Sequence, residues 1–424
     1  MAFTPEKLLD RLVMLPSAVT RYLIGFSGGL DSTVLLHALV QLECSARGYI
    51  EAAHVHHGLQ PQANGWADHC RRVCERFAVR FRLIYVNAEA AKGESPEAAA
   101  RYARYRALQE FLTARTCLLT AHQQDDQAET LVLQSLRGSG PAGLAAMPEI
   151  AAFGGGWHAR PLLCFTRAEL LDYATIHKLD WVDDPSNCDT AAGRNYVRHK
   201  VMPTLRRRWP KAAHTLTRVA GLQAEANQLL AELAMQDLGA VRGSRPETVS
   251  VSGLMRLSPA RQRNALRYWL TERGLLVPSR RQLEHVQTDA IGARRDGVPT
   301  IKWPGGEVRR YRDNLFAMTP LRCHDPTLIL HWDARRALPI AHLGVTLYPS
   351  ILQEARIASI AGKADITIRF RHGGERCRVK GQRHHRDLKK LLQEAGVPPW
   401  ERDRIPLIYA GERLLAVVGH WLCD

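Results

Sequence analysis

The sequence lacks several features that would point to other classes of protein. Its nine cysteines form no CxxC pair, so neither a zinc ribbon nor a thioredoxin-like redox site is expected. The first twenty residues hold no signal-peptide core, and no apolar run approaches the roughly eighteen residues of a membrane span. Internal repeats and low-complexity tracts are absent as well. Unpatterned thiols fit a reducing compartment, and we therefore expect a cytoplasmic protein without a membrane anchor.

The sequence has fewer acidic than basic residues. The 42 aspartates and glutamates face 58 lysines and arginines, which leaves a formal net charge of +16. A field of this sign attracts phosphate backbones, so nucleic acid is the first partner to consider. The alternative is a protein that is basic without any such partner.

The first half of the chain alternates short apolar runs with helical periods. The runs predict strands at 22–26, 50–55, 81–86 and 117–121, and the periods predict helices at 33–44, 64–77, 95–114 and 126–136. This alternation is typical of an α/β domain with a parallel sheet and crossover helices. Ligands of such sheets bind beyond the carboxyl ends of the strands. Ser27, His56 and His122 each follow a predicted strand end, and we expect them to meet in one crevice.

A glycine-rich turn, Ser27-Gly28-Gly29-Leu30-Asp31-Ser32, joins the first predicted strand to the first predicted helix. A helix N-terminus offers unpaired N–H groups and a partial positive charge, which favour a bound phosphate. Gly28 and Gly29 permit a close approach of the backbone, and Asp31 supplies a carboxylate suited to Mg²⁺. The turn has neither the lysine of GxxxxGK[ST] nor the spacing of GxGxxG. An ordinary serine-capped turn is the alternative, but the six residues resemble the SGGxDS pyrophosphate loop (PP-loop) of the N-type ATP pyrophosphatases.

Further blocks narrow the resemblance. They are His54-Val55-His56-His57-Gly58-Leu59, His122-Gln123-Gln124-Asp125-Asp126-Gln127-Ala128-Glu129-Thr130, Arg137-Gly138-Ser139-Gly140, and Asp183-Asp184-Pro185-Ser186-Asn187 with Arg194, Asn195 and Arg198 downstream. Together with the loop they resemble the bacterial tRNA(Ile)-lysidine synthase family. The C-terminal segment with Asp387-Leu388-Lys389-Lys390 also resembles the terminal domain of that family. The resemblance covers most of the chain and is weakest between about 240 and 360.

The resemblance implies a fold and a division into domains. A PP-loop catalytic domain with an α/β, adenine nucleotide alpha hydrolase-like fold would occupy 1–215, and a mainly helical tRNA-binding domain 216–320. A connecting segment at 321–362 would precede a small α+β tRNA-binding domain at 363–424. A long helix, read from the periodicity of residues 211–238, would lead from the first domain into the second.

The resemblance also implies a reaction. Members of the family use ATP with Mg²⁺ to adenylate the C2 oxygen of the wobble cytidine in tRNA(Ile) with a CAU anticodon, and they release diphosphate. Free L-lysine then attacks C2 and expels AMP, so that lysidine forms and the tRNA reads AUA and accepts isoleucine. A homodimer is compatible with this resemblance.

The matching positions imply the site residues. ATP would be bound by Ser27, Gly28, Gly29, Leu30, Asp31, Ser32 and His56, and Asp31 would also be the Mg²⁺ ligand. The implied catalytic residues are Asp31, Asp125, Asp126 and Glu129, and the last three carboxylates suit the cationic lysine. The sequence leaves open which of these three binds lysine and which binds metal, and each could instead be an acid that stabilises a helix N-terminus. The candidates for tRNA contact are Arg101, Arg104, Arg137, Arg194, Arg198, Arg206, Arg207, Arg378, Lys380 and Lys389.

Three alternatives stay open at this point. A PP-loop tRNA thiolase also adenylates a base, although such enzymes generally rely on cysteine pairs or clusters. A tRNA-binding protein with a vestigial nucleotide site would share the basic charge. The block His54, His56 and His57 could bind zinc, but no cysteine or carboxylate close in the sequence completes a ligand set.

Overall fold

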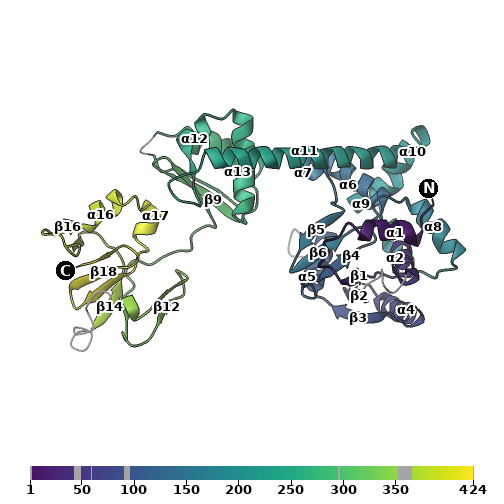
Figure 1. Ribbon diagram of the computed structural model, residues 1–424, viewed down its shortest axis with the longest axis horizontal. Coiled ribbons are helices and arrows are strands. Elements are labelled where there is room, and N and C mark those ends of the chain that lie inside the picture. Colours follow the sequence, from purple (N-terminus) through teal and green to yellow (C-terminus); the bar gives the residue numbers. More distant parts are fainter. Residues whose placement is uncertain are drawn as a thin grey trace. The chain divides into compact units, whose positions relative to one another are not determined.

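The computed structural model describes residues 2–42, 49–58, 60–89, 96–294, 297–351 and 365–423. Contacts divide the chain into two compact units, Met1–Leu230 and Ala231–Asp424. One long helix, α11 (Ala212–Ala240), contains the boundary between them (Figure 1). The predicted domain boundaries at 215/216 and 320/321 stay predictions. The boundary at 362/363 lies outside the described residues.

The first unit is built on a mostly parallel sheet, as predicted. Its strands are β1 (Arg21–Gly25), β2 (Tyr49–His56), β3 (Arg80–Tyr85), β4 (Thr116–Leu119), β5 (Ile150–Phe153) and β6 (Gly156–Ala159). They lie in the order β3-β2-β1-β4-β6-β5, and only β5 runs antiparallel to its neighbour. The sequence analysis predicted the first four strands and missed the β5–β6 hairpin.

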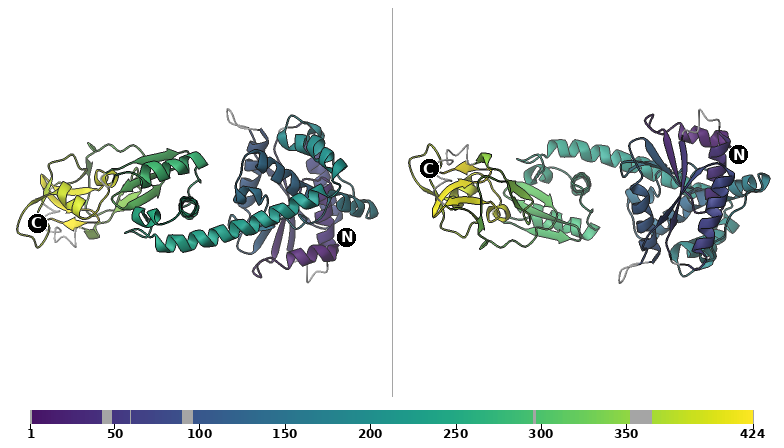
Figure 2. Two further views of the ribbon diagram at one scale, coloured as in Figure 1. Left: turned by 90° about the horizontal axis from the view of Figure 1, so that it is seen from above. Right: turned by 90° about the horizontal axis from the view of Figure 1, so that it is seen from below.

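Helices cover both faces of this sheet (Figure 2). They are α1 (Pro5–Leu12), α2 (Leu30–Gln41), α4 (Ala63–Arg76), α5 (Pro96–Gln109), α6 (Gln124–Leu136), α7 (Pro141–Leu144) and α8 (Arg167–Ile176). Successive strand residues point to opposite faces. Tyr22 and Ile24 therefore pack into the core that contains α1, α2 and α8, whereas Leu23 packs into the core that contains α5. The predicted helix ends at 44 and 95 lie outside the described residues.

A second group of helical elements follows the sheet in the sequence. It comprises the 3₁₀ turn η1 (Pro185–Cys188), α9 (Gly193–Tyr196), the π-helix η2 (Val197–Val201) and α10 (Met202–Arg208), and α11 follows them. Val197 and Met202 pack with Ala128 of α6 in a small core. This packing holds the segment of residues 193–208 against α6. Among the described residues, no helix is both long and apolar enough to cross a membrane.

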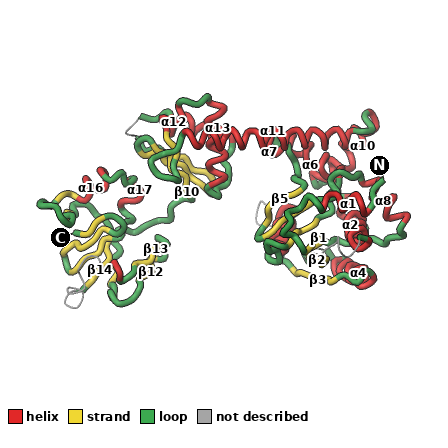
Figure 3. The backbone as a smooth tube through the Cα atoms, viewed as in Figure 1, coloured by secondary structure: helices red, strands yellow, loops and turns green. Residues whose placement is uncertain are grey.

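The second unit contains a middle region, in which helices accompany a small sheet, and a C-terminal region; Figure 3 colours the helices and strands of both. The middle region has α12 (Val251–Met255), α13 (Pro259–Glu272), α14 (Arg280–His285) and the π-helix η3 (Val286–Ile291), beside a sheet of β7 (Val249–Ser250), β8 (Thr300–Trp303), β9 (Gly306–Tyr311) and β10 (Asn314–Met318). The predicted helical character is confirmed, and the last part of this region forms β8, β9 and β10.

The C-terminal region combines small antiparallel sheets with short helices. Its largest sheet has the order β11-β14-β17-β18-β19. The elements are β11 (Leu330–His331), β12 (Leu338–Ile340), β13 (Val345–Leu347), β14 (Ile366–Arg369), β15 (Arg376–Cys377), β16 (Arg386–Asp387), α16 (Leu388–Glu394), α17 (Pro399–Arg402), β17 (Leu407–Ala410), β18 (Arg413–Val417) and β19 (Trp421–Leu422). This composition matches the α+β prediction.

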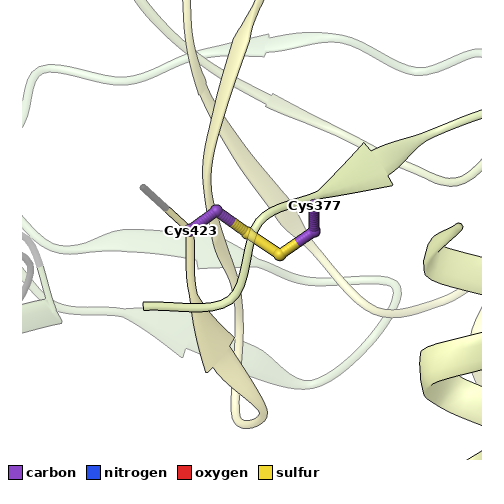
Figure 4. Close-up of a disulfide and its surroundings, with 2 residues drawn as sticks. All are labelled: Cys377 and Cys423. Atoms are coloured by element: carbon purple, nitrogen blue, oxygen red, sulfur yellow. A yellow bond between two sulfur atoms is a disulfide. The ribbon is translucent and has the colours of Figure 1, made fainter. Parts of the chain in front are cut away.

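One disulfide joins two cysteines that the sequence analysis left unpaired. Cys377 in β15 is bonded to Cys423, with 5.7 Å between their Cα atoms (Figure 4). Both are buried in the same small core. They stand 46 residues apart, and no local spacing pattern reveals such a pair. The other described cysteines are free thiols, and Cys70 and Cys74 lie buried on α4.

Candidate active site

A cavity of about 590 Å³ opens at the carboxyl ends of the central strands. Ser27, His56 and His122 all line it, so the three predicted strand ends do meet in one place. Clefts that bind nucleotides and other small ligands commonly have volumes of roughly 300–1,000 Å³. The cavity is therefore large enough for a nucleotide.

The glycine-rich turn forms one wall of this cavity, and its shape depends on Gly28. That residue has φ of +81°, a left-handed conformation that L side chains rarely adopt. A Cβ built there would also lie 2.8 Å from Cys70 Sγ. Gly29 is the N-cap of α2, and the hydroxyls of Ser32 and Thr33 each donate to its carbonyl at 3.0 Å. The first N–H groups of α2 lack partners within the helix and face the position where a phosphate would lie.

Asp31, in the first turn of α2, has the most unusual environment among the predicted site residues. Its Oδ1 atom is buried and has no hydrogen-bond partner. Burial, followed by the negative charge of Asp126, raises the pKa of Asp31 from its ordinary value to about 7. A buried oxygen without a partner, on a group that resists ionisation, is what a hard cation such as Mg²⁺ would satisfy. The residues present at this point therefore fit the predicted ion.

The histidine block lines the same cavity as the glycine-rich turn. His54 is buried beneath the turn, with Nδ1 2.9 Å from the carbonyl oxygen of Phe26. His56 lies 3.0 Å from Asn64 Oδ1, and burial lowers the pKa of His57 to about 4. Among the described residues, no group of three or more histidine, cysteine or acidic side chains is arranged to hold a metal. Burial lowers the pKa of both His54 and His57, so these two rings contribute a neutral part of the cavity wall.

The three predicted lysine-binding acids are all paired with arginines. Glu129, which is 2% exposed, accepts from Arg198 Nε at 2.8 Å and from Arg194 Nε at 3.2 Å. Asp126 Oδ1 accepts from Arg198 Nη2 at 2.8 Å, and its Oδ2 accepts from the Gln123 N–H at 3.0 Å.

Asp125 is paired with a different arginine, Arg206. Only Asp126 of the three acids lines the cavity, beside Arg194 and Arg198. The sequence analysis assigned these arginines to tRNA and the acids to lysine, whereas the structure pairs the arginines with the acids. Their roles in binding stay predictions.

The remaining basic candidates divide between the cavity and the surface. Arg101 and Arg104 line the cavity, and both guanidinium groups lie over the ring of Tyr105. Arg137 and Arg207 are exposed outside the cavity lining. The candidates in the C-terminal region, Arg378, Lys380 and Lys389, belong to the second unit.

Several cavity residues were not named as site residues from the sequence. Arg167, the first residue of α8, lines the cavity, and its charge opposes the rise in the pKa of Asp31. Asp183, Asp184, Ser186 and Asn195 also line it. Their place is fixed in part by a hydrogen bond from the Val182 N–H to the Gly28 carbonyl, at 2.9 Å. The block of residues 183–187 had carried the resemblance, and this could have identified these side chains as part of the site.

Comparisons with known proteins agree with this geometry. The family model of the PP-loop domain matches residues 5–205, the TilS substrate binding domain matches 250–316, and the TilS substrate C-terminal domain matches 366–424. The tRNA(Ile)-lysidine synthase of Coxiella burnetii (strain RSA 493 / Nine Mile phase I) is 41% identical over 422 residues, which cover 100% of this chain and 93% of that protein. The tRNA(Ile)-lysidine synthase of Alkalilimnicola ehrlichii (strain ATCC BAA-1101 / DSM 17681 / MLHE-1) is 44% identical over 420 residues, with coverage of 98% and 93%.

A solved structure of a U34-tRNA thiolase, NcsA from Methanococcus maripaludis with its [4Fe-4S] cluster, matches 52% of this chain and 78% of its own. Its TM-score of 0.43 and identity of 17% are too low to bear on the function. The sequence relatives, by contrast, extend over almost all of both chains. The chain belongs to the tRNA(Ile)-lysidine synthase family.

Proposed function

We propose that this protein ligates lysine to the wobble cytidine of tRNA(Ile) with a CAU anticodon. The C2 oxygen of the cytosine attacks the α-phosphorus of ATP, and diphosphate leaves. The ε-amine of free L-lysine then attacks C2, AMP leaves with the oxygen, and the amine loses a proton. The product is lysidine, which lets the tRNA read AUA and accept isoleucine. Near-full-length identity to relatives named for this activity supports the proposal.

The observation that carries the proposal is the unpartnered carboxylate of Asp31 at the start of α2. ATP would lie with its phosphates on the turn from Ser27 to Ser32 and its nucleoside toward His56. Asp31 would hold Mg²⁺, and the ion would supply positive charge to the diphosphate leaving group. The turn itself contributes backbone N–H donors, which need no reorganisation during the reaction.

The lysine substrate would lie at the opposite wall of the cavity. A free amino acid carries a carboxylate and ammonium groups, so its site needs charges of both signs. Asp126 lines the cavity and suits an ammonium group, and Arg194 and Arg198 beside it suit the carboxylate. Asp125 and Glu129 would act by holding the arginines in position.

The tRNA would contact basic side chains in both units. Arg101 and Arg104 are the candidates nearest the target base, because they line the cavity. Arg137, Arg206, Arg207, Arg378, Lys380 and Lys389 would contact the phosphate backbone, which contributes affinity but little sequence information. We place the reaction in the cytoplasm, where tRNA, ATP and free lysine occur together. The homodimer is a prediction that sedimentation equilibrium of the purified chain tests.

The direct test incubates the purified protein with ATP, Mg²⁺, radiolabelled lysine and a tRNA(Ile) transcript with a CAU anticodon. We expect label in the RNA and one AMP released per lysine incorporated. Replacing the wobble cytidine by uridine should abolish incorporation, because uracil does not present the same N3 and exocyclic groups. Label that enters both transcripts equally would contradict the proposed target.

The same assay separates the alternatives. A vestigial nucleotide site predicts tRNA binding without AMP formation, and Asp31→Ala would then change nothing in ATP turnover. A thiolase predicts AMP formation that depends on a sulfur donor and not on lysine. Lysine-dependent incorporation that Asp31→Ala removes, with tRNA affinity kept within a few fold, would exclude both.

A further inference from the structure

Four side chains at one wall of the cavity form a continuous series of hydrogen bonds. Arg160 Nη2 lies 3.2 Å from His158 Nδ1, His158 Nε2 lies 2.9 Å from Thr120 Oγ1, and Thr120 Oγ1 lies 2.9 Å from His122 Nδ1. Thr120 and His122 come directly after β4, and His158 and Arg160 lie at the end of the adjacent parallel strand β6. Thr120 and His122 line the cavity, whereas His158 and Arg160 are buried behind it.

Arg160 sets the direction of the whole series. A guanidinium group can only donate, so His158 Nδ1 must accept from it. Burial and the charge of Arg160 lower the pKa of His158 to about 3, so the ring is neutral and its single proton is on Nε2. His158 Nε2–H therefore donates to Thr120 Oγ1. The hydroxyl proton of Thr120 is then directed to His122 Nδ1.

These hydrogen bonds also determine which ring nitrogen of His122 carries a proton. Its Nδ1 accepts from Thr120, so the proton of the neutral ring is on Nε2. Burial and the positive charges of Arg160 and Arg101 lower the pKa of His122 well below its ordinary value, so the ring stays neutral. Arg160 also donates to the carbonyl oxygen of Pro148 at 2.8 Å, which holds the guanidinium in position.

We propose that His122 is a fixed hydrogen-bond donor for the reaction, and that Thr120, His158 and Arg160 are positioning residues that keep its proton on Nε2. The inference rests on the proposed function for the identity of the substrates. The acceptor is an oxygen, either on the α-phosphate of ATP or at C2 of the target cytosine. His122 cannot be the base that takes the proton from the lysine amine, because Nδ1 is bonded to Thr120 and Nε2 already carries a proton.

A matched pair of variants tests the series. Thr120→Val keeps the side-chain shape and removes the hydroxyl, so His122 is free to move its proton to Nδ1. Thr120→Ser keeps the hydroxyl. We expect Thr120→Val to lower kcat/KM for lysidine formation about tenfold to a hundredfold, the effect of losing one aligned hydrogen bond to a charged or developing-charge group. Thr120→Ser should restore it to within about twofold of the wild type.

A spectroscopic measurement separates this role from a merely structural one. The full-length protein labelled with ¹⁵N-histidine reports by NMR which ring nitrogen carries the proton, and the loss of signals in His122→Gln assigns that ring. We expect Nε2–H for His122 in the wild type and in Thr120→Ser, and a mixture of the two neutral forms in Thr120→Val. Nδ1–H in the wild type, or full activity of Thr120→Val, would overturn the proposal.

His122→Ala identifies the acceptor. If the α-phosphate is the acceptor, ATP binding in the absence of tRNA should weaken about tenfold. If the cytosine oxygen is the acceptor, ATP binding should be unchanged, and only tRNA-dependent diphosphate release should fall. His122→Gln, whose amide N–H reaches a similar point, should recover part of the loss.

The NMR result does not depend on lysidine formation. A protein with Nε2–H that forms no lysidine would contradict the proposed function and leave the tautomer assignment intact.

Discussion

Asp31 and Glu129 are both acids near one cavity, and their electrostatic environments are opposite. Asp31 has a buried oxygen without a partner, and its pKa is raised to about 7. Glu129 accepts hydrogen bonds from two arginines and is 2% exposed. A carboxylate without a partner costs stability and is available to a ligand, whereas a paired one stabilises the fold and is already engaged. The comparison indicates that Asp31, in α2, is available to a ligand, whereas Glu129, in α6, holds two arginines in position.

The largest expected effect is on activity at the unpaired end. Asp31→Asn keeps the shape of the side chain and removes the charge that would hold Mg²⁺ against the diphosphate. We expect diphosphate release to fall about a thousandfold, a typical cost of removing an electrostatic contact made in the transition state. Circular dichroism and tRNA binding should stay as in the wild type. Activity within tenfold of the wild type would remove Asp31 from the site.

The next effect is on stability at the paired end. Glu129→Gln removes one of the two carboxylates that pair with Arg194 and Arg198, and this should lower the free energy of unfolding by about 3 kcal/mol. Urea denaturation measures it. The matched control is Glu149→Gln, because Glu149 pairs with Arg11 at 3.8 Å and its side chain is 36% exposed. An exposed pair of this kind should cost less than about 1 kcal/mol. Equal losses in the two variants would show that the buried pairing of Glu129 contributes no more to stability than an exposed pair.

A pH dependence should distinguish the two ends in the ligand-free protein. The pKa of Asp31 is raised from 3.8 to about 7, so between these values the folded state binds a proton that the unfolded state has lost. Stability from this group therefore falls as pH rises from about 4 to 7. Asp31→Asn cannot titrate, so its free energy of unfolding relative to the wild type should increase over that interval. A difference that is constant with pH would show that Asp31 ionises normally in the folded protein.

The smallest effect extends the comparison to the surface. Lys390 is already paired with Asp387 at 3.8 Å, whereas its neighbour Lys389 is a candidate for tRNA phosphate contact. Lys389→Ala should lower the slope of log affinity for tRNA against log salt by about 0.9, the value for one phosphate contact in a duplex. Lys390→Ala should change the slope less. Filter binding at several salt concentrations measures both, and a larger change for Lys390→Ala would reverse the assignment.

The sequence predicted the parts of this molecule that depend on local pattern. The apolar run around Leu23 and Ile24 predicted a strand, and these residues do pack into the two cores beside the sheet. The glycine-rich turn at Gly28 predicted one wall of a phosphate site. The β5–β6 hairpin was missed because both strands are four residues long and are joined through Gly154 and Gly155. His158 and Arg160 were missed with it.

The pairing of acids with arginines could not be predicted for a different reason. Glu129 and Arg198 are 69 residues apart, and only the packing of residues 193–208 on α6 brings them together. Their separate charges suggested separate ligands, lysine for one and tRNA for the other. The same limit applies to Cys377 and Cys423, which are joined by the fold and not by any spacing.

The hydrogen bond from Val182 to Gly28 has a consequence for synthesis of the chain on the ribosome. The cavity takes residues from Gly25 to Arg198, so its first wall is translated more than a hundred residues before its last. A nascent chain that ends before Val182 contains the whole glycine-rich turn and still lacks the segment that closes over it. Ribosome-bound chains of increasing length should therefore acquire ATP binding abruptly, once Arg198 has left the exit tunnel, and not gradually as the sheet forms.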